Sequence, residues 1–188
     1  KLVLFATNGR FYTLACDKLP GGRGNGEPVR LLLDLANDQE IVDLMVHDPE
    51  RKLLVAATDG RGFVVEEKAT VAQTRSGRQV LNVSGDVEAA VCAPVQGDHL
   101  AVVGDNHKLI IFPIEELPEM TRGRGVVLQK YRDGGLADAK TMNLADGLTW
   151  KQAGGRTRTE TDLEMWLGKR SQAGRLAPKG FPKNHKFG

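Results

Sequence analysis

The residues best suited to chemistry in this sequence are arginines that recur beside glycines. They lie in three short segments, Gly21–Gly26, Arg75–Arg78 and Arg122–Gly125. A guanidinium group can donate two parallel hydrogen bonds to phosphate oxygens, and glycine lets the main chain approach a ligand closely. These Gly/Arg loops therefore predict binding of a phosphate-rich polyanion. The candidate contact residues are Arg23, Arg75, Arg78, Arg122 and Arg124.

A second basic region lies at the C-terminal end of the chain. Residues 151–188 hold nine Lys and Arg against three acidic residues, whereas the whole chain has a net charge of only +2. This uneven distribution also favours a polyanionic partner. The Pro, Gly and Lys content of residues 177–188 predicts a mobile tail that adds affinity without imposing curvature on a ligand. The candidate contact residues here are Lys169, Arg170, Arg175 and Lys179.

Residues arranged for catalysis or metal binding are scarce. None of the three serines lies in a Gly-x-Ser-x-Gly turn, and the four histidines lack metal-ligand spacing. The acidic pairs Glu66-Glu67 and Glu115-Glu116 are interpreted as solvated charges at strand ends. Gly21–Gly26 lacks both the dinucleotide-binding register and the Gly-Lys-Ser/Thr ending of a P-loop. We therefore expect a chain that is not itself catalytic and that holds no metal or cofactor.

Short strands are expected to position the loops. Turn dipeptides recur at steps of 51, 46 and 41 residues, at Asn8-Gly9, Asp59-Gly60, Asp105-Asn106 and Asp146-Gly147. Such dipeptides tolerate the positive φ of a tight hairpin turn, and apolar β-formers flank the first three on both sides. The pattern predicts hairpins at all four positions.

Each hairpin belongs to a larger unit. The unit reads strand, turn, strand, tight turn, strand, Gly/Arg loop, strand, over about 45 residues. Runs such as Ile41–Val46 and Val29–Leu33 are expected as strands of these units, and Asp162–Lys169 as a helical turn or strand. Four strands per repeat predict an all-β, propeller-like array of four-stranded blades. The expected repeats are 1–40, 41–86, 87–137 and 138–176.

Composition excludes other classes of protein. The chain has 188 residues, of which 40% are hydrophobic and 27% charged, as in a folded globular domain. No apolar stretch approaches the length of a membrane span. Cys16 and Cys92, the only cysteines, favour a reduced, cytoplasmic setting. Because the chain opens on Lys1 without an initiator Met, we interpret it as a piece of a longer protein.

The pattern from Leu4 to Leu14, continuing through Lys18 to Gly24, resembles the C-terminal domains of the A subunits of bacterial type IIA topoisomerases. Within that gyrase A and topoisomerase IV A family, it is most similar to the topoisomerase IV members. The similarity covers essentially the whole chain and is looser in the last repeat, where the Gly/Arg loop is displaced to 169–175. The resemblance implies a β-pinwheel, in which neighbouring blades exchange strands and a basic rim binds and bends duplex DNA.

The resemblance also carries expectations about the parent protein. Gyrase A domains carry a glutamine-led Arg-Arg-Gly-Gly-Lys-Gly box that is absent here, so topoisomerase IV is favoured over gyrase. The parent would perform ATP-dependent strand passage in decatenation and relaxation with the B subunit of topoisomerase IV, which would bring ATP and Mg. The attacking tyrosine would lie upstream, and neither Tyr12 nor Tyr131 is assigned that role. DNA contacts would reach phosphates rather than bases, in a cytoplasmic, nucleoid-associated protein.

Two alternatives remain open from the sequence. One is a propeller-like protein-interaction scaffold that docks a chromosome-organising partner through an acidic or apolar face. The other is a wrapping domain of the gyrase A type.

Overall fold

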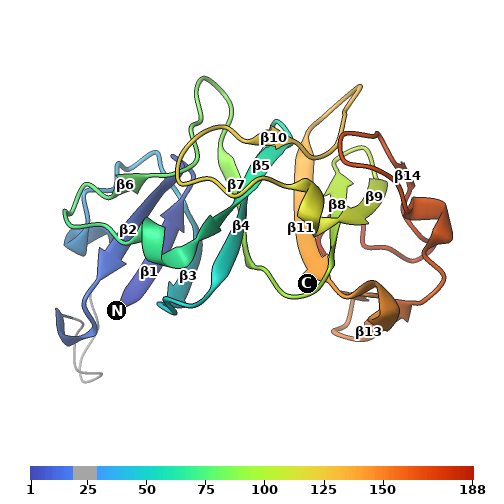
Figure 1. Ribbon diagram of the computed structural model, residues 1–188, viewed down its shortest axis with the longest axis horizontal. Coiled ribbons are helices and arrows are strands. Elements are labelled where there is room, and N and C mark those ends of the chain that lie inside the picture. The colour runs from blue at the N-terminus through green and yellow to red at the C-terminus, as the bar shows by residue number, and fades with distance from the viewer. Residues whose placement is uncertain (19–28) are drawn as a thin grey trace.

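The computed structural model describes residues 1–18 and 29–188, which form short antiparallel sheets and 3-10 helices (Figure 1). Arg23 and the loop Gly21–Gly26 lie outside the described residues. No helix within the described ranges is long or apolar enough to cross a membrane.

Three hairpins form the centre of three four-stranded sheets. In each hairpin an apolar strand turns tightly and pairs with the next strand along the chain. The pairs are β1 (Leu2–Ala6) with β2 (Arg10–Leu14), β4 (Lys52–Ala57) with β5 (Arg61–Glu66), and β8 (His99–Gly104) with β9 (Lys108–Pro113).

The outer strands of each sheet come from later parts of the chain. Their bounds are β3 (Ile41–Val46), β6 (Arg78–Gln79), β7 (Ala89–Pro94), β10 (Val126–Val127), β11 (Leu136–Met142) and β14 (Arg175–Leu176). The strand orders are β3-β1-β2-β6 in sheet 1, β10-β5-β4-β7 in sheet 2 and β11-β8-β9-β14 in sheet 3. Each hairpin is thus flanked by strands that precede and follow the next hairpin. This exchange confirms the all-β, pinwheel-type array.

The first three turns share one conformation. The N–H of Gly9, Gly60 and His107 donates to the carbonyl three residues earlier, at 2.9, 3.0 and 3.0 Å. These residues have φ of +78°, +86° and +66°. In the third turn the left-handed residue is His107, whereas the sequence predicted Asn106, one position earlier. Asn106 instead accepts a hydrogen bond from the Lys108 N–H, as Asn8 does from Arg10.

The fourth hairpin is not at Asp146-Gly147. That dipeptide lies at the end of the 3-10 helix η5 (Leu144–Asp146). The strand before it, β11, pairs with β8 rather than with the strand after it, so η5 connects two different sheets. The hairpin is formed by β12 (Leu148–Lys151) and β13 (Thr157–Glu160), and its turn is 152–155. These two strands form a separate two-stranded sheet, so the fourth repeat is not a four-stranded blade in the described residues.

Alternating side chains build an apolar core on each face of the hairpins. Phe5 and Phe11 of sheet 1 pack against Phe63 of sheet 2, and Leu54 of sheet 2 packs against Phe112 of sheet 3. This period-2 burial explains why the hairpin strands are apolar on both faces. The sheets therefore stack face to face, each buried by its neighbours.

The outer face of sheet 1 is covered by a segment that was expected to be a strand. Val29–Leu33 is wrong as a strand, because Val29–Leu32 forms the 3-10 helix η2. Leu33 and Leu35 then pack on Leu4 and Tyr12 in place of a neighbouring sheet.

The remaining short helices lie in the connections. They are η1 (Cys16–Lys18), η3 (Glu67–Thr70), η4 (Ile114–Glu116) and η6 (Glu164–Trp166). Asp162–Lys169 was expected as a helical turn or a strand, and η6 shows the helical turn.

The C-terminal segment is packed rather than loose. Phe181 and Phe187 are 5% exposed and join the core that contains Trp150. Their rings lie 5.4 Å apart between centroids, and Phe181 lies 5.4 Å from Trp150. The prediction of a mobile tail over 177–188 is wrong. Two buried aromatic side chains hold this segment on the core despite its Pro and Gly content.

Candidate nucleic-acid interface

The Gly/Arg loops lie beside the hairpin turns of the preceding sheets. After the second loop, Val80 N donates to Gly9 O at 3.1 Å; after the third, Leu128 N donates to Gly60 O at 2.7 Å. After the displaced last loop, Ala177 N donates to the carbonyl of His107 at 2.8 Å. Figure 1 shows the associated strands β6, β10 and β14 following one another along the upper side of the molecule. The loops are therefore equivalent in position.

The glycines of these loops have a structural role. Gly77, Gly125 and Gly174 have φ of +76°, +78° and +81°. A Cβ at each would lie 2.7, 2.2 and 2.3 Å from a carbonyl oxygen of the adjacent hairpin strand. Only glycine fits such a close approach at positive φ. The recurrence of glycine thus follows from strand pairing and is not evidence for phosphate approach.

The loop arginines occupy different positions and engage different neighbours. Arg75 Nε lies 3.6 Å from Asp34 Oδ1, and Arg124 Nη2 lies 3.5 Å from Asp59 Oδ2. Arg122 Nε donates to Asn82 Oδ1 at 3.4 Å, and Arg78 is exposed on β6. These side chains are exposed at one side of the fold, but two of the four face a carboxylate.

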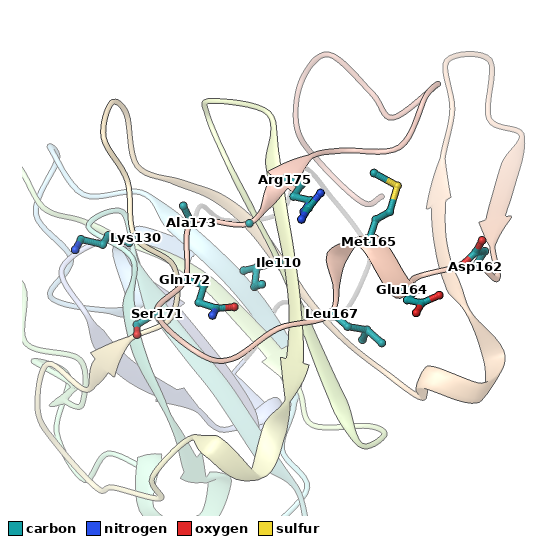
Figure 2. Close-up of a pocket in the computed structure, with 11 residues that line it drawn as sticks. Ile110, Lys130, Asp162, Glu164, Met165, Leu167, Ser171, Gln172, Ala173 and Arg175 are labelled. Carbon is teal, nitrogen blue, oxygen red and sulfur yellow. The ribbon is translucent and has the colours of Figure 1, made fainter.

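The candidates in the last loop are less uniform. Arg170 Nη1 donates to Val127 O at 2.8 Å, so its guanidinium holds main chain. Exposed Arg175 lines a hollow of about 680 Å³ together with Lys130, Asp162 and Glu164. In Figure 2, Lys130 lies at one end of this hollow and the two carboxylates lie at the other. Because carboxylates repel phosphate, the hollow does not suit a polyanion.

The other two candidates, Lys169 and Lys179, are exposed. Lys169 follows η6, and Lys179 lies in the packed C-terminal segment.

A repeated basic position escaped the sequence analysis. Gly155 N donates to Gln152 O at 3.1 Å with φ of +84°, so 152–155 is the counterpart of the turn that ends at Gly9. In all four turns the residue after the left-handed position is basic. These residues are Arg10, Arg61, Lys108 and Arg156. The spacing was hidden because the third turn was placed one residue early and the fourth was placed at the wrong dipeptide.

The four turn cations differ in exposure. Arg156 is exposed and the other three are half-buried. Arg10 Nη1 donates to Ser76 O at 3.2 Å, which ties the first turn to the loop beside it. We call the side of the fold that carries these four turn cations and the neighbouring Gly/Arg loops the basic edge.

Four buried or half-buried groups have pKa values that are shifted mainly by burial, and two of them, Asp138 and Lys140, also influence each other. Burial raises the pKa of the Cys92 thiol and of the Tyr131 phenol, and it raises the pKa of Asp138 and lowers that of Lys140. Among the described residues, no group of three His, Cys, Asp or Glu side chains could hold a metal ion. Both cysteines are free.

The two tyrosines are structural. The Tyr131 ring packs against Gly60 and Gly104, between the second and third turns. Tyr12 OH accepts a hydrogen bond from Asn8 Nδ2 at 2.9 Å inside the first hairpin.

Glu67 differs from its expected setting. It was interpreted as a solvated charge, yet it is fully buried. Its carboxylate lies 2.7 Å from both Arg51 Nε and His47 Nδ1 and accepts the Asp48 N–H at 2.5 Å. Buried carboxylates are retained when paired in this way. Glu67 therefore fastens the turn at 47–51 to the end of β5.

Comparisons with known proteins agree with this architecture. The family model described as "DNA gyrase C-terminal domain, beta-propeller" matches residues 1–48 and 98–136. The chain is 48% identical over 187 residues to the A subunit of DNA topoisomerase 4 from Caulobacter vibrioides, covering all of this chain and 24% of that relative. It is 42% identical to the Rickettsia bellii protein of the same name, again covering all of this chain and 25% of the relative. The chain thus spans about a quarter of these relatives.

Solved structures show the same fold. The E. coli ParC C-terminal domain superposes with a TM-score of 0.83 at 23% identity, over 97% of this chain and 78% of that one. A DNA gyrase A C-terminal domain superposes with a TM-score of 0.73 at 13% identity, over 95% of this chain and 62% of that one. With the strand exchange, the family match and the identity along the full chain, this protein belongs to the family of C-terminal β-pinwheel domains of the topoisomerase IV and gyrase A proteins, on the topoisomerase IV side.

Proposed function

We propose that this domain binds duplex DNA along its basic edge and bends it, so that duplex segments are oriented for a type IIA topoisomerase. The observation that carries the proposal is the cation after the left-handed residue in all four turns. Because equivalent positions in stacked sheets fall along one side, their charges add into one potential. A row of cations on stacked sheets matches phosphates spaced along a curved duplex.

The contacts would be made to phosphates. Arginine and lysine at turn tips reach the backbone of DNA without entering a groove, so little sequence preference is expected. Arg75, Arg78, Arg122 and Arg124 would add contacts beside the turns, while Lys169 and Lys179 would add them at the C-terminal end. Arg170 and Arg175 are weaker candidates, because one holds main chain and the other shares a hollow with two carboxylates.

The parent polypeptide would carry the chemistry elsewhere. We infer that it is the A subunit of a cytoplasmic, nucleoid-associated topoisomerase IV. With the B subunit it would perform ATP- and Mg-dependent decatenation and relaxation during chromosome segregation. This assignment is supported by 48% and 42% identity to the two named relatives along the whole of this chain. In that setting the domain contributes DNA capture and orientation, and no catalytic group is assigned to it.

A chromosome-organising protein would need a different surface. On strand β3, Leu44 is 44% exposed and Val46 is 69% exposed, although Cys92, the counterpart of Leu44 on β7, packs into a core. Docking of such a partner would depend on this apolar strand and would tolerate changes at the basic edge.

The test is a gel-shift and circularisation assay of the domain on unrelated duplex sequences at several salt concentrations. Binding that weakens steeply with salt, together with faster circularisation of short duplexes, supports the proposal. Absence of binding at low salt would overturn it.

A further inference from the structure

A hollow lies between the fourth hairpin turn and the C-terminal segment. Its volume is about 560 Å³, and its lining includes three lysines, Lys151, Lys183 and Lys186. The turn residues Gln152 and Ala153 also line it. We call this feature the terminal hollow.

The terminal hollow is strongly positive. None of the described residues that line it is acidic. The Arg158 guanidinium lies beside it, because a Cβ on Gly180 would come within 2.9 Å of Arg158 Nη1. Lys186 Nζ donates to Ala137 O at 2.5 Å, whereas Lys151 and Lys183 are exposed. The last two are therefore the cations best placed for a ligand.

The segment that carries Lys183 and Lys186 is held at both ends. At its start, Ala177 N donates to His107 O in the third turn at 2.8 Å. At its end, Phe187 N donates to Asp138 Oδ2 at 3.0 Å, and Phe187 O accepts from Lys151 N at 2.8 Å. The buried side chains of Phe181 and Phe187 hold the stretch that carries both lysines against the core. The lysines are thus displayed from fixed positions on the domain.

The terminal hollow continues the basic edge. Its wall includes the fourth turn, whose Arg156 is the last of the four turn cations. Phe181 bridges to the third turn, since its ring centroid lies 6.0 Å from that of His107. A duplex that follows the turns in order would therefore reach the terminal hollow after the fourth turn.

We propose that the terminal hollow binds backbone phosphates of the same duplex, with Lys151 and Lys183 as the contacting residues. This proposal rests on DNA binding by the basic edge and extends it. A mobile tail follows DNA wherever it lies, but a cation held in place attracts phosphate to one position. The C-terminal segment is consequently part of the surface that sets the bend.

The experiment compares double variants of the whole 188-residue domain. Lys151→Ala/Lys183→Ala removes two charges from the terminal hollow. Lys52→Ala/Lys68→Ala removes two charges away from the four turns, one from the first residue of β4 and one from η3, where these lysines pair with Glu119 and Glu66. Affinity is measured by fluorescence anisotropy from about 50 to about 200 mM salt. Bending is measured by energy transfer between dyes at the two ends of the duplex.

For the terminal-hollow variant we expect the slope of log K against log salt to become less negative by about 1.8, from two lost contacts of about 0.9 each. Over the fourfold salt range, the affinity ratio of parent to variant would then shrink about twelvefold. The distance between the duplex ends should increase. The control variant should match the parent in salt slope and in end-to-end distance.

Other outcomes separate the two proposals. If the parent binds and bends DNA but the terminal-hollow variant matches it in slope and end-to-end distance, the terminal hollow is not a phosphate site. If the salt slope becomes less negative while the end-to-end distance is unchanged, the terminal hollow binds DNA but does not bend it. The bending part of the inference is then overturned. If the parent itself fails to bind DNA, DNA binding by the basic edge fails as well.

Discussion

Arg61 and Lys108 occupy the same backbone position in the second and third turns, so replacing both by alanine tests the basic edge directly. Their main-chain N–H groups donate to Asp59 Oδ1 at 3.1 Å and to Asn106 Oδ1 at 3.0 Å. Alanine retains both hydrogen bonds, because neither involves the replaced side chain. The free energy of unfolding should therefore change by no more than about 0.5 kcal/mol.

The effect on DNA binding follows from counterion release. Each cation that neutralises a phosphate contributes about −0.9 to the slope of log K against log salt, so two lost contacts make the slope less negative by about 1.8. Between about 50 and 200 mM salt, the affinity ratio of parent to variant should fall about twelvefold. The loss should be similar on unrelated duplex sequences, since phosphates carry no sequence information directly.

Fluorescence anisotropy with two duplexes of different sequence measures the salt slope and the affinity on each sequence. Lys52→Ala/Lys68→Ala is the matched loss of two charges away from the four turns. A variant with the slope of the parent would refute the reasoning. So would an equal loss in the control, because binding would then depend on total charge rather than on the turns.

Three further predictions concern other parts of the fold. Arg122→Ala/Arg124→Ala should flatten the salt slope less than the turn variant does in the same anisotropy assay, because both side chains already engage neighbours. Gly60→Val should lower the free energy of unfolding in urea by about 2–5 kcal/mol, since φ is +86° and a Cβ would lie 2.5 Å from an aromatic carbon. Burial, and then the nearby His185, lower the pKa of His107, so the unfolded chain holds that proton more tightly. The contribution of His107 to the free energy of unfolding should be complete above about pH 6.5 and should be lost as the pH falls through the lower pKa of the folded state. His107→Asn should reduce this pH dependence, as measured by thermal unfolding from about pH 5 to 8.

Local sequence chemistry predicted the hairpins well, because a turn and its flanking strands are close in the chain. Asn8-Gly9 and Asp59-Gly60 turn as expected, and the apolar runs on both sides are strands. The partners of the outer strands were not predictable from local patterns. β3 pairs with β1 and β6 pairs with β2 across long separations, and any apolar edge strand satisfies the same pattern. Only the family resemblance indicated strand exchange.

The errors at the turns have a common physical cause. His107 adopts a left-handed conformation that composition rarely predicts, while Asp146-Gly147 has hairpin composition without adjacent paired strands. The two shifts broke the alignment of Lys108 and Arg156 with the earlier turns. Burial of Glu67 and packing of Phe187 depend on contacts distant in sequence, which a local pattern cannot contain.

Glycine and arginine recur together in the loops for separate reasons, and the distinction affects which residues report on function. Gly77 and Gly125 are required where a short outer strand meets the hairpin main chain, so a pinwheel would keep them whether or not it bound DNA. No such packing requirement is visible at Arg61 and Lys108, the residues after the left-handed position of the second and third turns, because their described contacts are made by main chain. A basic side chain at this position in four turns therefore carries more information about a polyanionic ligand than the glycines do. The loop arginines support the same surface, but the turn cations define it.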